Sequence, residues 1–145
     1  MLLSMENCEL CAVLQKENYR VVLSSVHSFI CLNHEPLSEA HLLILPKRHI
    51  LKPQELTPDE AKDILSLLEH LSEKLPSHFN MKGAMSFLNH GAHRTQQHLH
   101  FHFLPLHEGL RYLVAPYLNV DLRKKRSKEE LVRLTLELKR KLELQ

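Results

Sequence analysis

Histidines alternate with large apolar residues along the stretch His98–Phe103. A period of two is typical of a β-strand, in which successive side chains point to opposite faces. The three imidazoles would then share one face, with Leu99, Phe101 and Phe103 on the other, which can be buried. Successive imidazoles on such a face lie roughly 7 Å apart. The sequence therefore predicts a strand that presents a row of imidazoles, either for chemistry or as a histidine-rich face without chemistry.

Composition narrows the class of protein around this strand. At 145 residues the chain is expected to form one domain, and its 43% hydrophobic and 25% charged content is ordinary for a soluble protein. A net charge of +2 is too small to argue for nucleic-acid binding, whereas twelve histidines point to metal or acid–base chemistry. We see no signal peptide and no apolar run near 18 residues, so we expect a cytoplasmic protein without a membrane partner.

The cysteines are three in number, which does not suggest a disulfide framework. Cys8 and Cys11 form a Cys-x-x-Cys that brings two sulfurs to one side of a tight turn, as in half of a zinc site. That interpretation needs two more ligands from elsewhere. A redox pair and two unrelated cysteines are the alternatives that the local sequence leaves open. Cys31 lies in an apolar run and is expected to be a buried structural thiol.

The remaining segments predict a strand-rich first half with one long helix. Thr57, Pro58 and Glu60 form a strong helix start with a capping box, and Pro76 is expected to end that helix. A second capping box at Ser127 opens a final amphipathic helix. Strands are expected at 19–24, 28–33, 41–46 and 83–89, and 110–120 reads as a strand or an irregular covering segment. This order predicts an α+β domain with a mainly antiparallel sheet.

Three imidazoles on one strand face allow two chemistries. In the first, they help to hold a catalytic metal. In the second, a neutral imidazole attacks phosphorus and forms a covalent phosphohistidine-type intermediate. The second needs the attacking ring to be oriented through its other nitrogen, and needs donors for the phosphate oxygens. Nearby donors are Asn89, Thr95, Gln96 and His102.

These motifs together resemble the histidine triad (HIT) superfamily. The stretch from His98 to Leu104 is similar to its His-φ-His-φ-His-φ-φ signature. Phe29–Asn33, His41 and Pro46–His49 look like an earlier block of the family, and the turn Asn89-x-Gly91 fits as well. The resemblance implies a HIT fold with a mainly antiparallel sheet, a central helix and a C-terminal helix. It also implies a single domain over 1–145, with the triad core at about 6–105 and a C-terminal segment at 106–145.

The resemblance also implies roles for particular residues. His100 would be the nucleophile, His102 would contact the phosphate and the leaving group, and His41 would support them from the neighbouring strand. Asn33 matches a residue that holds the ribose hydroxyls. Phe29, Ile30 and Leu32 would line the base pocket, and Asn89 and Thr95 would surround the phosphates. Arg94 stands where many members carry glutamine, and it would add a positive contact to a longer polyphosphate.

A structural zinc is implied by some bacterial members and related uridylyltransferases. Their ligands correspond here to Cys8, Cys11, His49 and His98, a closed Cys₂His₂ set, so no catalytic metal is required. The implied activity is that of a nucleotide hydrolase or transferase acting at the α-phosphate of a purine nucleotide conjugate. The conjugate would be a dinucleoside polyphosphate or a nucleoside phosphoramidate, and the intermediate a nucleotidyl-histidine on His100. A metal-dependent hydrolase and a non-catalytic nucleotide-binding module are the alternatives, and a homodimer is expected.

Overall fold

The computed structural model describes residues 7–93, 95–118 and 127–143. A five-stranded antiparallel sheet has the order β1-β2-β3-β5-β4. The strands are β1 (Val21–Ser24), β2 (Ser28–Leu32), β3 (Leu42–Pro46), β4 (Gly83–Phe87) and β5 (Phe101–Leu106). The helices are α1 (Glu9–Lys16), α2 (Pro58–His78), α3 (Leu110–Leu118) and α4 (Lys128–Glu143), with short 3₁₀ turns at Asn18–Arg20, Pro53–Glu55 and Gly91–His93. The predicted α+β class is confirmed.

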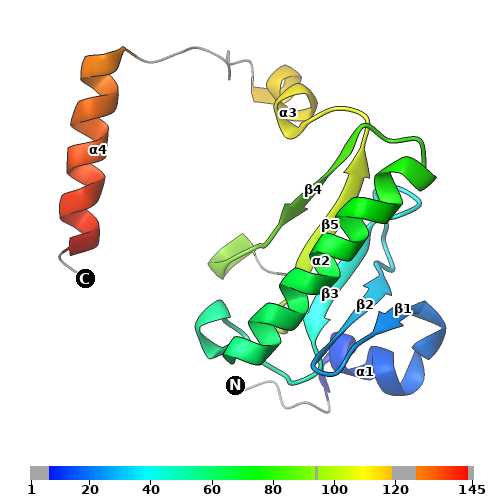
Figure 1. Ribbon diagram of the computed structural model, residues 1–145. Helices are drawn as coiled ribbons and strands as arrows, with labels where there is room; N and C mark the ends of the chain where they lie inside the picture. Colours follow the sequence, from blue (N-terminus) through cyan, green and yellow to red (C-terminus); the bar gives the residue numbers. More distant parts are fainter. Residues whose placement is uncertain (1–6, 94, 119–126, 144–145) are drawn as a thin grey trace. The chain divides into compact units, whose positions relative to one another are not determined.

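The sheet has a buried apolar cluster on each face. One cluster joins Phe29, Cys31, Leu43 and Leu45 to Leu10 and Val13 of α1. The other joins Ile30, Leu42, Ile44 and Phe103 to Ile64, Leu67 and Leu71 of α2. Helix α2 crosses one face of the sheet (Figure 1). Because His102 pairs with Leu43 and Phe103 pairs with Leu42, His102 lies on the face opposite α2.

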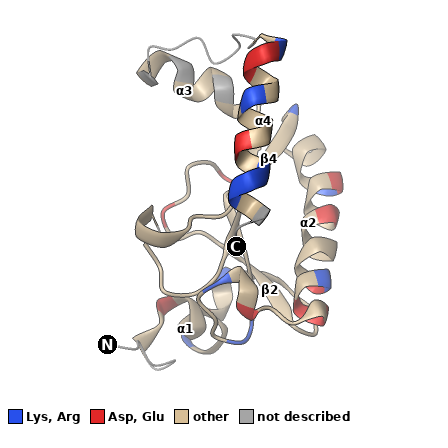
Figure 2. Cartoon of the chain, turned by 90° about the vertical axis from the view of Figure 1, so that its left-hand side faces the viewer, with Lys and Arg blue, Asp and Glu red and all other residues tan. Residues whose placement is uncertain are grey.

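Helix α2 begins as predicted. The N–H of Glu60 donates to Thr57 Oγ1 at 3.2 Å, and the N–H of Thr57 donates to Glu60 Oε2 at 2.9 Å, which completes the capping box. The charged residues of α2 lie mostly along its side away from the sheet (Figure 2). The predicted end at Pro76 is wrong, because the helix continues to His78. A proline in the last turn removes only one late helical hydrogen bond, so the helix tolerates it.

Glu60 also binds Arg48, which donates from Nε to Oε1 at 2.9 Å and from Nη2 to Oε2 at 2.8 Å. These bonds lower the pKa of the Glu60 carboxyl to about 2 from an ordinary 4.5. Since the pKa is lower in the folded state, the stabilisation is present above about pH 4.5 and is lost as the pH falls toward 2. We expect Glu60→Gln to reduce the free energy of unfolding by about 1 kcal/mol at pH 7.

Urea unfolding at pH 7, 5 and 3 checks this expectation. The difference in the free energy of unfolding between Glu60→Gln and wild type should be largest at pH 7. It should be smaller at pH 3, where the wild-type carboxylate begins to bind a proton. Glu73→Gln is the matched control, because Glu73 and Lys74 form an exposed pair on the same helix. A difference for Glu60→Gln that stays constant across this range would exclude the ion pair as its cause.

Two other segments differ from their predicted structure. The predicted histidine strand begins only at Phe101, because β3 pairs with β5 through 101–103 alone. Before that point the N–H of Leu99 donates to Ile50 O at 2.7 Å, outside the sheet. The prediction of a strand or irregular segment at 110–120 is wrong, since α3 occupies Leu110–Leu118 with Pro116 inside it.

The chain divides into two compact units, residues 1–110 and 111–145. In the second unit Ser127 Oγ accepts the N–H of Glu130 at 3.2 Å, which confirms the predicted cap of α4. Among the described helices, none has the length and apolar character needed to cross a bilayer. The single domain over 1–145 and the homodimer remain predictions.

Candidate active site and metal centre

The three histidines of the row are buried, with exposed fractions of 0% for His98, 5% for His100 and 9% for His102. Protein therefore covers the side that carries these histidines, as it covers the side that carries Leu99 and Phe103. The three rings also have different neighbours. His98 contacts the two cysteines of the first turn of α1, whereas His102 contacts His41 and Phe87. The row is thus divided between two sites.

The ring of His100 is oriented by backbone. Its Nδ1 lies 2.7 Å from the carbonyl oxygen of His98. A carbonyl oxygen can only accept, so Nδ1 carries the hydrogen and the neutral ring has its lone pair on Nε2. A nucleophilic imidazole requires this tautomer, in which one nitrogen is held in place and the other carries the lone pair.

A chain of hydrogen bonds sets the tautomer of His102. The N–H of Leu37 donates to His41 Nδ1 at 3.1 Å, so the hydrogen of His41 lies on Nε2. His41 Nε2 then donates to His102 Nδ1 at 2.9 Å, which leaves the hydrogen of His102 on its own Nε2. His102 Nε2 is buried and has no hydrogen-bond partner among the described residues. The site therefore presents a buried N–H donor that no described residue satisfies.

Burial, and then the neighbouring His100 and His41, lower the pKa of His102 to about 4. Burial also lowers the pKa of His41. His102 is consequently neutral at pH 7, and it can donate a hydrogen bond without carrying a charge. A neutral donor of this kind suits stabilisation of negative charge on an oxygen better than it suits proton donation.

Phe87 is a site residue that sequence reasoning missed. Its ring stacks on His102 with centroids 4.4 Å apart and planes 7° apart. The contact arises because Phe87 of β4 pairs with His102 of β5. The sequence predicts a strand at 83–89, but it contains no local signal for the register that places these two residues side by side.

Asn33 lies beside the His41–His102 pair. Its N–H donates to His41 O at 3.0 Å, which extends the pairing of β2 and β3, and its Oδ1 accepts the N–H of Glu35 at 3.1 Å. The predicted ribose residue is therefore next to the histidines and is held by its own loop.

The predicted phosphate residues follow β4. Asn89 is half-buried just after that strand, and Thr95 is exposed. Gln96 is half-buried, and its Nε2 donates to Glu9 Oε2 at 2.8 Å. Arg94 lies outside the described residues.

The predicted base-pocket residues do not share a face. Ile30 and Leu32 lie with the α2 cluster, on the opposite face of the sheet from His102. Phe29 lies on the histidine face but is fully buried in the α1 cluster. Successive residues of a strand point in opposite directions, so the three cannot line one pocket on the histidine face. A base pocket there requires other side chains.

Cys8, Cys11, His49 and His98 form a cluster that could hold a metal ion. One ligand atom from each lies within 4.8 Å of the others. Cys11 Sγ lies 3.3 Å from both His49 Nδ1 and His98 Nδ1, and Cys8 Sγ lies 3.6 Å from His98 Nδ1. Tetrahedral zinc separates its sulfur and nitrogen ligands by about 3.5 Å, given bonds of about 2.3 and 2.0 Å. The four residues therefore fit such an ion.

The surroundings of this cluster also favour a cation. His98 Nε2 donates to Pro46 O at 3.0 Å, so the lone pair of the ring is on Nδ1 and faces the sulfurs. Burial and the neighbouring Cys8 raise the pKa of the Cys11 thiol to about 12. A thiolate at this position thus needs a positive charge beside it, which a bound metal ion supplies.

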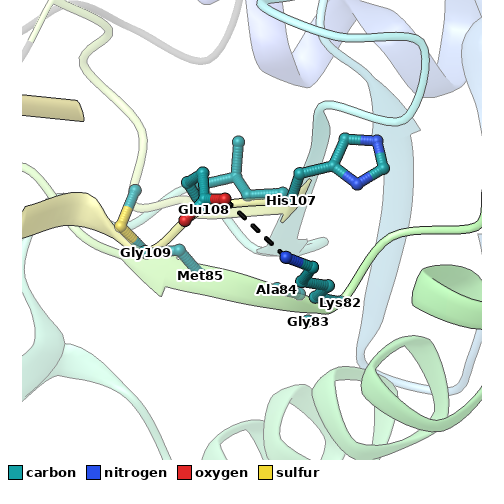
Figure 3. Close-up of a pocket in the computed structure, with 8 residues that line it drawn as sticks. Lys82, Gly83, Ala84, Met85, His107, Glu108 and Gly109 are labelled. Carbon is teal, nitrogen blue, oxygen red and sulfur yellow. Dashed lines mark ion pairs between the residues drawn. The ribbon is translucent and has the colours of Figure 1, made fainter. Parts of the chain in front are cut away.

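A small pocket of about 190 Å³ lies elsewhere, between Lys82–Met85 and Leu106–Gly109 (Figure 3). Lys82 Nζ and Glu108 Oε1 are 3.8 Å apart across it. It adjoins the Gly83–Leu106 end of the β4–β5 pair, whereas His102 lies at the Phe87 end. Four residues of strand, about 13 Å, separate the two ends, so this pocket is distinct from the histidine site.

Comparison with known proteins gives a consistent result. The HIT domain model matches residues 15–109. Adenosine 5'-monophosphoramidase hnt1 of Schizosaccharomyces pombe is 30% identical over 103 residues, covering 68% of this chain and 74% of that protein. Bis(5'-adenosyl)-triphosphatase of Dictyostelium discoideum is 31% identical over 80 residues, 54% of each chain. The nitrilase and fragile histidine triad fusion protein NitFhit of Caenorhabditis elegans is 30% identical over 91 residues, 61% of this chain but only 21% of the fusion.

A solved structure agrees in fold. The Zn-bound histidine triad family protein from Mycobacterium smegmatis superposes with a TM-score of 0.65 at 19% identity, covering 90% of this chain and 91% of that one. The family match spans most of the chain and includes β1 to β5. The chain belongs to the HIT family.

Proposed function

We propose that this protein is a nucleotide hydrolase or nucleotidyl transferase that cleaves at the α-phosphate of a purine nucleotide conjugate. The observation that carries the proposal is the bond from His100 Nδ1 to His98 O, which places the lone pair of the neutral ring on Nε2, the nitrogen that would attack phosphorus. Relatives named as an adenosine monophosphoramidase and a bis(5'-adenosyl)-triphosphatase support two substrate classes. These are nucleoside phosphoramidates and dinucleoside polyphosphates.

In the first step, His100 Nε2 forms a bond to the α-phosphorus, and the bond from phosphorus to the leaving group breaks. The leaving group takes the electron pair of that bond, and it takes a proton from solvent where it needs one. Negative charge on the phosphate oxygens is greatest at this point. The neutral His102 donates from Nε2 to such an oxygen, which satisfies the buried donor that the described part of the chain leaves unpaired. His41 keeps His102 in the required tautomer.

In the second step, water or another acceptor attacks the nucleotidyl-histidine. The bond between phosphorus and His100 Nε2 breaks, and the electron pair returns to that nitrogen. When water is the acceptor, it gives up a proton to solvent and the nucleotide leaves as the monophosphate. The ring returns to its starting tautomer, because Nδ1 keeps its hydrogen on the His98 carbonyl throughout. Two easier displacements thus replace one difficult displacement.

The metal cluster has a structural role in this proposal. Two cysteines and two histidines are ligands that zinc prefers, and the Mycobacterium smegmatis protein named as Zn-bound has the same fold. Four protein ligands fill a tetrahedral zinc, so the ion supplies rigidity and leaves no position for substrate. A metal-dependent hydrolase that uses all three row histidines is less well supported. Among the described residues, the cluster that could hold an ion includes His98 but neither His100 nor His102.

A single-turnover experiment tests the proposal. The purified protein is mixed with a dinucleoside triphosphate or a nucleoside phosphoramidate, each with adenine, guanine or a pyrimidine base. We expect a purine monophosphate as product. Quenching in alkaline denaturant should trap a chain that is heavier by one nucleotidyl group, and fragmentation should place that group on His100. Samples are quenched throughout the first turnover. If monophosphate is released and none of these samples contains an adduct at His100, the covalent route is excluded.

A further inference from the structure

Glu9 makes a contact that neither the sequence motifs nor the proposed chemistry require. Its Oε2 accepts a hydrogen bond from Gln96 Nε2 at 2.8 Å, across 87 positions of sequence. Glu9 is the first residue of α1 and directly follows Cys8, whose Sγ accepts the N–H of Cys11. A carboxylate in the first turn of a helix is stabilised by the helix dipole. Glu9 is therefore an acceptor held at a defined place beside the metal cluster.

The segment that receives this contact leads directly to the nucleophile. Thr95–Gln97, here named the 95–97 loop, ends three residues before His100, within about 11 Å of it along the chain. The following residues are anchored: His98 binds Pro46 O, and the N–H of Leu99 donates to Ile50 O at 2.7 Å. The loop itself lies at the surface, with Thr95 exposed and Gln96 half-buried. The Glu9 contact attaches this outer part of the loop to α1.

We infer that Glu9 is a positioning residue that acts through Gln96 to order the 95–97 loop at the edge of the His100 site. The effect on kcat/KM that we expect rests on the proposed function, whereas the effect on the order of the 95–97 loop does not. Gln96 is predicted from the sequence to contact substrate. In the structure its amide nitrogen donates to Glu9, and we assign it the role of holding the loop. A loop that is already ordered loses less conformational entropy when substrate binds.

Exchanging the two residues tests the contact. Glu9→Ala removes the acceptor, and Gln96→Glu places two carboxylates face to face. Each should lower kcat/KM roughly fivefold, mainly through KM. The double variant Glu9→Gln with Gln96→Glu restores an amide–carboxylate pair in the opposite direction, so it should return to within about twofold of wild type. If the double variant stays as impaired as Gln96→Glu alone, position 96 acts by contacting substrate and the inference fails.

Amide hydrogen exchange gives a readout that does not depend on turnover. Without substrate, amides of the 95–97 loop should exchange roughly fivefold faster in Glu9→Ala than in wild type, with metal content unchanged and Tm lowered by no more than a few degrees. Gln15→Ala is the control, because it changes an exposed residue of α1 away from the loop. Equal loop exchange in Glu9→Ala and wild type would overturn the inference. If wild type releases no monophosphate, the proposed function fails, and loop exchange still decides the role of Glu9.

Discussion

His100→Ala is expected to lower turnover at least about a thousandfold while nucleotide binding persists. The reason is that the variant removes the Nε2 lone pair, whereas His102 and Asn33, the residues proposed to contact the substrate, remain in place, as does the bond from His41 to His102. Steady-state monophosphate release measures the rate, and titration with a non-hydrolysable nucleotide analogue measures binding. The loss should appear in kcat, because the missing interaction is made with the reacting phosphorus.

His70→Ala is the control for this variant. His70 is an exposed histidine on α2, on the opposite face of the sheet from His102, so its removal should leave turnover unchanged. Near-normal turnover of His100→Ala would refute the assignment of the nucleophile. A loss of nucleotide binding together with turnover would instead show that the variant disturbs the site as a whole.

The second large effect is expected from the metal cluster. Wild-type protein purified without added zinc should contain about one zinc per chain, and Cys11→Ser should contain none. Cys11 is the better choice of the two cysteines, because Cys8 Sγ also caps α1. The variant should lose about 4 kcal/mol of the stability that wild type has when free zinc exceeds its Kd about a thousandfold. Elemental analysis and urea unfolding with and without zinc measure the two quantities.

Cys31→Ala is the matched control for Cys11→Ser. Cys31 is a fully buried thiol in the α1 cluster, and it takes no part in the metal cluster. Its removal should cost some packing but should leave the zinc content and the zinc dependence of unfolding unchanged. A folded wild-type protein that contains no metal and does not respond to zinc would refute the structural ion.

Features with a local cause were predictable from the sequence. The start of α2 follows from Thr57, Pro58 and Glu60, which satisfy the first helical N–H groups within one turn. Features with a distant cause were not. The start of β5 at Phe101 depends on Leu99 bonding to Ile50, and the stacking of Phe87 on His102 depends on strand register. Neither partner can be read from the segment itself.

The candidate site divides in the same way. The motifs predict His100 as the nucleophile and the Cys₂His₂ set as metal ligands, and the structure brings the four residues of that set together. The tautomers, however, are set by the carbonyls of His98 and Pro46 and by the N–H of Leu37. Every residue carries such groups, so sequence gives no sign of which ones are used. At the predicted base pocket the sequence pattern is present but the geometry differs: Ile30 fits a family position, yet its side chain faces α2.

His98 contributes three separate atoms, and this has an evolutionary consequence. Its Nδ1 faces the cysteines, its Nε2 reaches Pro46, and its carbonyl orients His100. Only the first of these depends on an ion. A descendant that lost Cys8, Cys11 and His49 would still gain from a histidine at position 98, because the bond from its Nε2 to Pro46 O anchors the backbone whose carbonyl orients His100. The metal set and the histidine row can therefore be inherited independently.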